Sequence, residues 1–343
     1  RAVMKILVTG AAGFIGFFVA KSLLEKGYTV VGMDNINDYY DINLKYARLR
    51  ELGIAKTGAE VFNNLTQSEN HAHFSFIRLA LEDRKNLPEL FKKQSFDVVC
   101  NLAAQAGVRY SLENPEAYVD SNLVGFLNIL ECCRNFEIKH LVYASSSSVY
   151  GLNDKVPFKT TDRVDHPISL YAATKKSNEL MAHTYSHLYD FATTGLRFFT
   201  VYGPWGRPDM AYFSFTENIL ANKPINVYNN GQLARDFTYI DDIIKGLILV
   251  IEKGFKPNSE SKSKASVYNI GRGKPVKLMD FINTIGTHLE KEVKLVMMPM
   301  QDGDVYTTWA DTTELKKNYA YAPQIDLEIG VKNFIEWYRS YKK

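Results

Sequence analysis

The run VTGAAGFIG at residues 8 to 16 constrains the fold of this chain most strongly. The apolar segment Met4 to Thr9 leads into it with the pattern of a buried parallel strand, and the amphipathic segment FFVAKSLLEKG follows it and ends at Gly27. Glycines at positions 10, 13 and 16 let the backbone turn tightly and approach a pyrophosphate, which such turns hold at the N-terminus of the next helix. The run therefore predicts a strand, a glycine turn and a helix that together bind a dinucleotide.

An acidic residue ends the next predicted strand. Thr29 to Met33 has the pattern of a strand, and Asp34 lies eighteen residues after Gly16, where a carboxylate accepts hydrogen bonds from the adenosine ribose. A carboxylate repels a 2′-phosphate and no Arg follows Asp34 directly, so the pattern favours NAD over NADP. The alternative, a glycine turn used only for packing, does not account for the strand, the helix and the acid together.

Strand and helix patterns alternate along the first 200 residues. Strand-like segments occur at 73–79, 96–103, 138–146 and 193–199, and helical segments at 44–51, 86–93, 115–135 and 171–189. This alternation is typical of a parallel sheet with helices on both faces. We predict an α/β fold: a Rossmann-type, doubly wound parallel sheet with a smaller, mixed C-terminal substrate lobe. The predicted domains are an NAD-binding domain at 4–200 with a return segment near 227–251, and a substrate lobe at 201–226 and 252–343.

Composition narrows the class of protein. The chain is 46% hydrophobic, and no apolar stretch has membrane-spanning length or the pattern of a signal peptide before the first strand. A net charge of +3 is too small and too scattered to indicate nucleic acid binding. Cys100, Cys132 and Cys133 are odd in number and lack metal-ligand spacing, which indicates reduced, buried thiols. We expect a cytoplasmic enzyme with no metal site and no membrane or nucleic acid partner.

Tyr171 and Lys175 are four residues apart in the helical run SLYAATKKSNEL, so both side chains lie on one face of the helix. A free phenol has a pKa of about 10, and a neighbouring ammonium stabilises the phenolate and lowers that pKa. This pair alone is weak evidence, because half-exposed Tyr and solvated Lys are common at this spacing. Together with the glycine turn and Asp34, it predicts a proton-transfer site in which Lys175 lowers the pKa of Tyr171.

The segments GAAGFIG, NLAAQAGVRYS, SSSSVYG, YAATK and GLRFFTVYGPWGRPDM, together with Asp34, resemble the extended short-chain dehydrogenase/reductase family. Within it they are most similar to bacterial and plant UDP-glucuronate 4-epimerases, and the resemblance covers essentially the whole chain. It implies an isomerase that converts UDP-glucuronate to UDP-galacturonate through a transient 4-keto intermediate, with NAD as cofactor and a nucleotide-sugar-binding lobe.

The resemblance also assigns roles to residues of this chain. Tyr171 would remove the proton of the reacting hydroxyl, Ser146 would hydrogen-bond that hydroxyl, and Lys175 would hold the nicotinamide ribose. The implied cofactor contacts are Gly10, Gly13, Phe14, Ile15, Gly16, Asp34, Asn35, Leu102, Ala103, Ala104, Gln105, Asn122 and Lys175. The implied substrate contacts are Arg109, Ser147, Ser148, Thr200, Arg207, Arg235 and Asp304.

The residues after Ser146 separate related reactions. Nucleotide-sugar 4,6-dehydratases carry Asp-Glu there, because elimination needs an acid and a base, and UDP-glucuronate decarboxylases carry a Glu at the second place. Ser147 and Ser148 therefore favour epimerisation, and their hydroxyls suit a substrate carboxylate. A 4-epimerase of UDP-glucose or UDP-N-acetylhexosamine (or their uronates), a UDP-glucuronate decarboxylase and an NAD-sensing regulator remain alternatives. Arg207 is either a carboxylate ligand or an arginine that only stabilises its turn.

Two departures from the family pattern are visible. Ala80 stands where relatives have an Asp for the adenine amino group, and Gln301 stands where galactose-type epimerases have an Arg for the diphosphate. Neither position takes part in the predicted chemistry. By similarity, the helical segments 112–135 and 171–189 would pair with their copies in a symmetric homodimer.

Overall fold

A sheet of eight strands forms the centre of the molecule. The structure, a computed structural model, describes residues 3–301 and 304–343. The strand order is β12-β7-β6-β5-β1-β2-β4-β3, and all neighbours are parallel except β3 and β4. The strands are β1 Lys5–Thr9, β2 Thr29–Asp34, β3 Leu65–Gln67, β4 Phe74–Arg78, β5 Val98–Asn101, β6 His140–Ser146, β7 Ala192–Phe198 and β12 Ala265–Ile270.

The order of the strands reverses at β1. This strand pairs with β2 on one side and with β5 on the other, so the connections after β1 and after β5 diverge. In doubly wound sheets such a reversal opens a crevice beyond the carboxyl ends of the strands. The glycine turn after β1 and the segment 102–105 after β5 both lie at this point.

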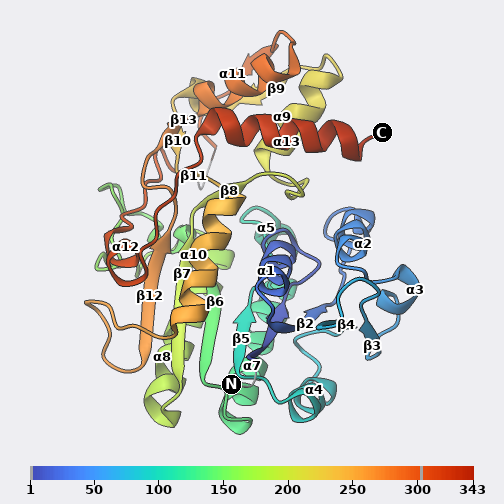
Figure 1. The fold of residues 1–343 in the computed structure, drawn as a ribbon. Helices are drawn as coiled ribbons and strands as arrows, with labels where there is room; N and C mark the ends of the chain where they lie inside the picture. Colours follow the sequence, from blue (N-terminus) through green and yellow to red (C-terminus); the bar gives the residue numbers. More distant parts are fainter. Residues whose placement is uncertain (1–2, 302–303) are drawn as a thin grey trace.

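Helices cover both faces of the sheet (Figure 1). Side chains of successive strand residues point to opposite faces, so Ile6 and Val8 pack in one core cluster and Leu7 in the other. The first cluster includes residues of α1 and α10, and the second includes residues of α4, α7 and α8. The helices of this domain are α1 Phe14–Glu25, α2 Ile42–Glu51, α3 Lys56–Ala59, α4 Asn86–Gln94, α5 Tyr110–Glu113, α6 Pro115–Tyr118, α7 Gly125–Asn135, α8 Leu170–Tyr189, α10 Ile240–Lys253 and α12 Thr313–Tyr319.

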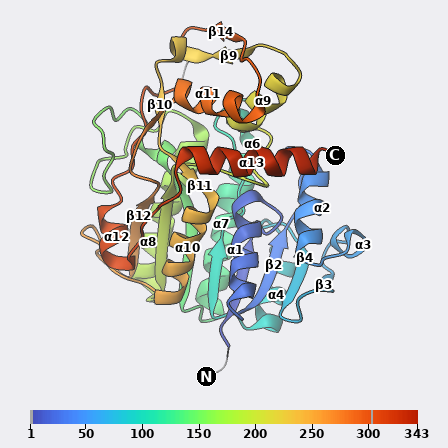
Figure 2. The same cartoon turned by 45° about the horizontal axis from the view of Figure 1, so that its top comes forward.

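A smaller lobe lies beyond the carboxyl ends of the strands (Figures 1 and 2). Helix α11 packs against both α9 and α13 there, and three two-stranded sheets pair β10 with β13, β11 with β8 and β14 with β9. These elements are β8 Thr200–Tyr202, α9 Ala211–Leu220, β9 Ile225–Val227, β10 Ala234–Arg235, β11 Phe237–Tyr239, β13 Val276–Lys277, α11 Leu278–Leu289, β14 Leu295–Met297 and α13 Leu327–Tyr341.

The structure confirms the predicted fold class, a doubly wound, mostly parallel sheet with a smaller mixed lobe. The division into two domains at the predicted residues remains a prediction, but residues 265–270, which it placed in the lobe, form β12 and hydrogen-bond to β7 at the edge of the sheet. The predicted helix 115–135 is interrupted by a π-helical turn at Val119–Val124. Within residues 3–301 and 304–343, no helix combines the length and the apolar character needed to cross a membrane.

Candidate active site

A cavity of about 970 Å³ lies at the carboxyl ends of the strands, between the sheet and the lobe. Residues from both parts of the molecule line it, from Gly10 after β1 to Arg235 in β10. All of the residues that the sequence singled out as site residues line this one cavity, with the exception of Asn122. The fold therefore brings together residues that are up to 294 positions apart, from Gly10 to Asp304.

The glycine turn has no room for side chains. A Cβ on Gly16 would lie 2.0 Å from the Gly10 carbonyl oxygen, and one on Gly10, whose φ is +73°, would lie 3.0 Å from the Ala103 backbone nitrogen. Helix α1 begins directly after Gly13, and no side chain caps it. Its first N–H groups lack intrahelical acceptors and face an anion-binding position at the positive end of the helix. This turn fits a pyrophosphate.

Asp34 lines the cavity at the end of β2. Its Oδ2 accepts a hydrogen bond from the Ala12 backbone N–H at 3.1 Å, and its Oδ1 accepts one from Ile36 at 2.8 Å. These two bonds fix the carboxylate beside the glycine turn, where it can accept hydrogen bonds from a ribose. Further residues at this end of the cavity, which sequence reasoning missed, are Leu79, Leu81 and Glu82.

Asn122 lies behind the cavity. In the π-helical turn, its Oδ1 accepts from the Gln105 N–H at 2.8 Å and its Nδ2 donates to the Gln105 carbonyl at 3.1 Å. The amide is thus used by the backbone of a loop that does line the cavity. That Asn122 contacts the cofactor stays a prediction; in the structure this side chain positions Gln105 and is itself 2% exposed.

Tyr171 and Lys175 lie in the first turns of α8, whose N-terminus is capped by the Ser169 hydroxyl. The Lys175 Nζ donates to the Ala144 carbonyl at 3.0 Å and lies 5.8 Å from the centre of the Tyr171 ring. Burial lowers the pKa of Lys175 to about 8. The helix therefore places the phenol and the amine on one side, as the spacing predicts.

The electrostatics of Tyr171 differ from the sequence-based expectation that Lys175 lowers its pKa. Burial raises the pKa of Tyr171 above its ordinary value. The positive charge of Arg207 and a hydrogen bond with Ser146 oppose this effect. Arg207 is thus a cation that acts to lower the pKa of Tyr171, while the charge of its partner Asp209 acts to raise this pKa. The Lys175 amine donates to a backbone carbonyl.

Four serines, Ser145 to Ser148, follow one another at the end of β6. Ser146 is the last residue of the strand, and the next two residues begin a 3₁₀ turn at Ser147–Tyr150. The Ser148 hydroxyl and backbone N–H donate to the Ser146 Oγ at 2.9 and 3.1 Å. The Ser146 hydroxyl, which accepts both bonds, keeps its own proton to donate to an oxygen at the Tyr171 side of the cavity.

Arg207 is paired with a carboxylate that sequence reasoning missed. It lies between β8 and α9, and its Nε donates to Asp209 Oδ1 at 2.9 Å while its Nη2 donates to Asp209 Oδ2. The Tyr39 hydroxyl donates to the same Oδ2 at 3.2 Å. Burial acts to raise the pKa of Asp209, but the charge and hydrogen bonds of Arg207 outweigh it and lower this pKa. The sequence signal was present, because Asp209 belongs to the RPDM motif.

The lobe end of the cavity carries two further arginines. The Arg235 Nη2 donates to Asp304 Oδ1 at 2.9 Å, which joins β10 to the segment that follows β14. Arg109, from the segment after β5, lies with its guanidinium 5.6 Å from the centre of the Tyr228 ring. Positive charge and an aromatic face thus meet at the end of the cavity that is farther from the glycine turn, an arrangement that suits a nucleoside diphosphate.

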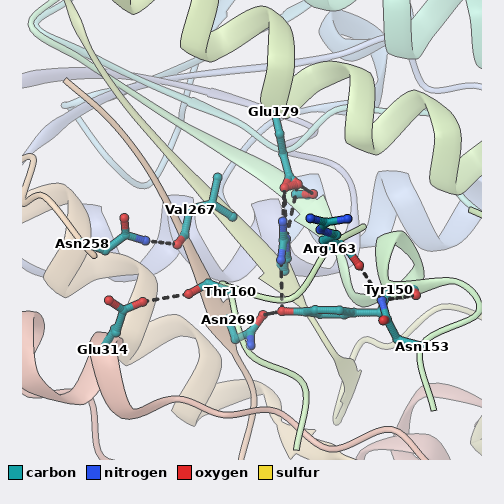
Figure 3. A network of polar contacts seen from close by, with 11 residues as sticks. Tyr150, Asn153, Thr160, Arg163, Glu179, Asn258, Val267, Asn269 and Glu314 are labelled. Atoms are coloured by element: carbon teal, nitrogen blue, oxygen red, sulfur yellow. Dashed lines mark hydrogen bonds and ion pairs between the residues drawn. The ribbon is translucent and has the colours of Figure 1, made fainter. Parts of the chain in front are cut away.

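A buried polar network that includes Glu179 and Tyr150, the last residue of the serine turn, is drawn in Figure 3. Arg197 in β7 donates through Nε and Nη2 to Glu179 Oε1 in α8 at 3.0 and 2.7 Å, and through Nη1 to the Tyr150 hydroxyl at 3.0 Å. The Tyr150 hydroxyl in turn donates to Asn269 Oδ1 of β12 at 2.6 Å. The network ties the serine turn and α8 to two strands of the sheet. Sequence reasoning did not find it.

These features agree with the comparisons with known proteins. The chain belongs to the NAD dependent epimerase/dehydratase family, whose model matches residues 6–271. Protein CapI of Staphylococcus aureus is 51% identical over 99% of this chain and 100% of that protein, and UDP-glucuronate 4-epimerase 1 of Arabidopsis thaliana is 47% identical over 98% of this chain and 77% of that protein. The crystal structure of UDP-glucuronic acid 4-epimerase from Bacillus cereus in complex with UDP-glucuronic acid and NAD has a TM-score of 0.84 and 31% identity, over 98% of this chain and 100% of that chain.

Proposed function

We propose that this protein is an NAD-dependent UDP-glucuronate 4-epimerase, which interconverts UDP-glucuronate and UDP-galacturonate through a 4-keto intermediate. The observation that carries the proposal is one cavity in which Tyr171, Lys175 and Ser146 lie beside the cation Arg207. The relatives named for this reaction match almost the entire chain.

The residues around the glycine turn fit NAD. The turn and the start of α1 would hold its pyrophosphate, and Asp34 would hold the adenosine ribose. Lys175 spends one of its three N–H donors on Ala144, so the others can reach the nicotinamide ribose. The chemistry that NAD would supply there is acceptance of a hydride from C4 of the sugar and its return to the opposite face.

Two side chains of the cavity, Tyr171 and Ser146, act on the proton of the C4 hydroxyl. Tyr171 takes the proton as the hydroxyl is oxidised and gives it back when the ketone is reduced. Ser146 donates a hydrogen bond to the same oxygen and holds it beside Tyr171. Arg207 and Ser146 both act on Tyr171 in the direction that favours phenolate.

The surroundings of Ser146 favour epimerisation over the related reactions. Ser147 and Ser148 line the cavity where an elimination would need an acid and a base, and neither can act as a base at neutral pH. Arg207, Thr200 and these hydroxyls provide a charged donor and neutral donors for the C6 carboxylate. A neutral hexose would leave the Arg207 charge without this partner.

The direct test is incubation of the NAD-loaded protein with UDP-glucuronate, with NMR of the product. We expect UDP-galacturonate at equilibrium with the substrate and no net change in NAD. A UDP-pentose as main product would identify a decarboxylase instead. Turnover of UDP-glucose or a UDP-N-acetylhexosamine with none of the uronate would identify a 4-epimerase of another hexose.

We further propose that the protein is a homodimer. The predicted pairing helices carry large apolar side chains on their outer surface: Leu112 is 81% exposed, Leu180 57% and Leu188 60%. Leu180 and Leu188 are eight residues apart in α8, a spacing that places both on one helical stripe, and an exposed apolar stripe is typical of interaction surfaces. Light scattering at micromolar concentration should give twice the mass of the chain, and Leu180→Asp should reduce it to a monomer.

We also propose a cytoplasmic location. Cys100, Cys132 and Cys133 are free and buried, which suits a reducing compartment. Recovery of the native protein in the cytosolic fraction of its source cells would support this location, and recovery with membranes or in the medium would contradict it.

A further inference from the structure

The guanidinium of Arg207 has two hydrogen-bonding edges, and Asp209 binds one of them. An arginine presents five N–H donors in a rigid planar fork. Nε and one N–H of Nη2 are bound by Asp209, which uses both carboxylate oxygens. Nη1 makes no hydrogen bond within residues 3–301 and 304–343, and the positive charge of Arg207 acts on Tyr171. The edge that remains for a ligand is therefore the outer edge, formed by Nη1 and the second N–H of Nη2.

Hydrogen bonds from other segments hold the backbone two residues before Arg207 and the side chain of its partner Asp209. Arg48, which is fully buried, donates to the Trp205 carbonyl at 2.6 and 3.1 Å and to the Ala12 carbonyl of the glycine turn at 2.9 Å. The segment just before Arg207 is thus attached to the dinucleotide turn. Tyr39, from the loop after β2, holds Asp209 by a hydrogen bond. Arg48 and Tyr39 thus hold two residues next to Arg207, Trp205 and Asp209, from two other segments of the chain.

We propose that Asp209 is a positioning residue for this reaction: it binds the inner edge of Arg207, so that the outer edge keeps the substrate carboxylate in place while the sugar turns over. The inference rests on the proposed epimerisation of UDP-glucuronate. In this role Asp209, whose carboxylate binds the Nε and Nη2 atoms of Arg207, acts on the substrate through that arginine.

The chemistry explains why a fixed guanidinium is needed. Oxidation at C4 makes a β-keto acid, and such an acid loses CO₂ when its C5–C6 bond lines up with the carbonyl π system. The C5–C6 bond then breaks, its electron pair forms an enolate with oxygen at C4, and C5 takes a proton from water to give a UDP-4-keto-pentose. A carboxylate held by a guanidinium that cannot rotate keeps C6 out of this alignment during the turn of the ring.

Because Asp209 is negatively charged, a role in positioning Arg207 and a role in substrate binding predict different changes in kcat and KM. Removal of this negative charge leaves Arg207 more attractive to an anionic substrate, so affinity should not fall. Removal of the anchor lets Arg207 move, and a displacement of about 1 Å can cost roughly 100-fold in rate. The signature of positioning is therefore a lower kcat with an unchanged or lower KM.

The experiment compares Asp209→Asn, Arg207→Ala and the double variant with the parent enzyme, all loaded with NAD and supplied with UDP-glucuronate. Asp209→Asn should lower kcat for epimerisation by roughly 10- to 100-fold, leave KM within about threefold or lower it, and raise the ratio of UDP-pentose to UDP-galacturonate. The double variant should match Arg207→Ala within about twofold in both rate and product ratio, because Asp209 acts through Arg207.

Two further variants test the contact between Asp209 and Arg207, and a third variant serves as a control. Asp209→Glu keeps the charge and should restore most of the parent product ratio, while Tyr39→Phe removes one hydrogen bond to Asp209 and should shift the ratio in the same direction by less. Tyr39→Phe also keeps the test open if Asp209→Asn does not fold. Asp38→Asn removes an exposed charge from the loop that carries Tyr39 and should behave as the parent.

Four outcomes overturn the inference. A parent enzyme that does not convert UDP-glucuronate removes the proposed function, and this inference with it. If the parent converts the uronate, the function stands, and the inference fails on any of three results: an unchanged product ratio in Asp209→Asn, a rise in KM without loss of kcat, or losses in the double variant that multiply those of the single ones.

Discussion

Replacement of Arg197 by Met should destabilise the protein more than any surface charge change. The Arg197 and Glu179 side chains are only 4% and 5% exposed, and their closest N–O distance is 2.7 Å. Without Arg197, the Glu179 carboxylate keeps only the Ser145 hydroxyl, at 3.3 Å, as a side-chain donor among the described residues. Breaking a buried pair in this way costs about 3 to 5 kcal/mol of unfolding free energy.

The expected change in melting temperature follows from the size of the chain. At about 2 cal/mol/K per residue, the unfolding entropy of 343 residues is roughly 0.7 kcal/mol/K. A loss of 3 to 5 kcal/mol therefore lowers Tm by about 4 to 7 °C. Thermal unfolding followed by circular dichroism, at one protein concentration and without added NAD, measures this shift.

Two controls separate the buried charge from other effects. Lys56→Met removes the pair with Glu60, whose side chains are 57% and 48% exposed, and should lower Tm by less than about 1 °C. The double variant Arg197→Met/Glu179→Leu removes both charges and should recover most of the lost Tm, because no unpaired buried charge remains. A single variant within about 1 °C of the parent, or a double variant that melts as low as Arg197→Met, would refute the reasoning.

Four other variants test the site itself. Tyr171→Phe should keep the fold and bound NAD but lose about 10² to 10⁴ in kcat, and turnover above about a third of the parent's would exclude Tyr171 as the base. Ser146→Ala should move the acidic limb of the kcat/KM profile to higher pH, because the hydrogen bond of Ser146 lowers the pKa of Tyr171 and the phenolate is the active form; an unmoved limb would contradict this. Asp34→Ala should weaken NAD more than NADP in binding titrations, since the carboxylate repels a 2′-phosphate, and equal losses would contradict its role. Gly16→Ala should lower both Tm and NAD content, because its Cβ would lie 2.0 Å from the Gly10 carbonyl oxygen, and a variant that retains both would show that the turn can shift.

Local patterns predicted the dinucleotide half of the site well. The strand, the glycine turn, α1 and Asp34 follow each other within 30 residues, and each has its own signature in the sequence. The predicted strands and helices before residue 200 match β4, β5, β6, β7, α2, α4 and α8 to within a few residues. Helix 115–135 is the exception, since nothing in its periodicity marks the π-helical turn that directs Asn122 at Gln105.

The missed residues depend on contacts between distant segments. Asp209 was visible in the RPDM motif, but its use as a partner of Arg207 follows from the path of a loop that has no regular period. Glu179 lies one helical turn after Lys175, and its partner Arg197 lies on a strand whose burial alone would favour an apolar residue. No rule of sequence spacing connects Glu179 with Arg197. Sequence reasoning can therefore assign each residue to a helix or strand, but it cannot predict that the two side chains form an ion pair.

The path of the chain between sheet and lobe has a consequence for how this protein can be altered. After β8 the chain builds part of the lobe, returns to the sheet in α10 and β12, leaves again at β13, and returns once more as α12 before it ends in α13 (Figure 1). The lobe is interwoven with the sheet. A fragment that stops near residue 200 would uncover the edge of β7, an open template for aggregation. Transfer of a foreign sugar specificity would therefore need the exchange of several lobe segments that are separated in the sequence by segments of the sheet domain.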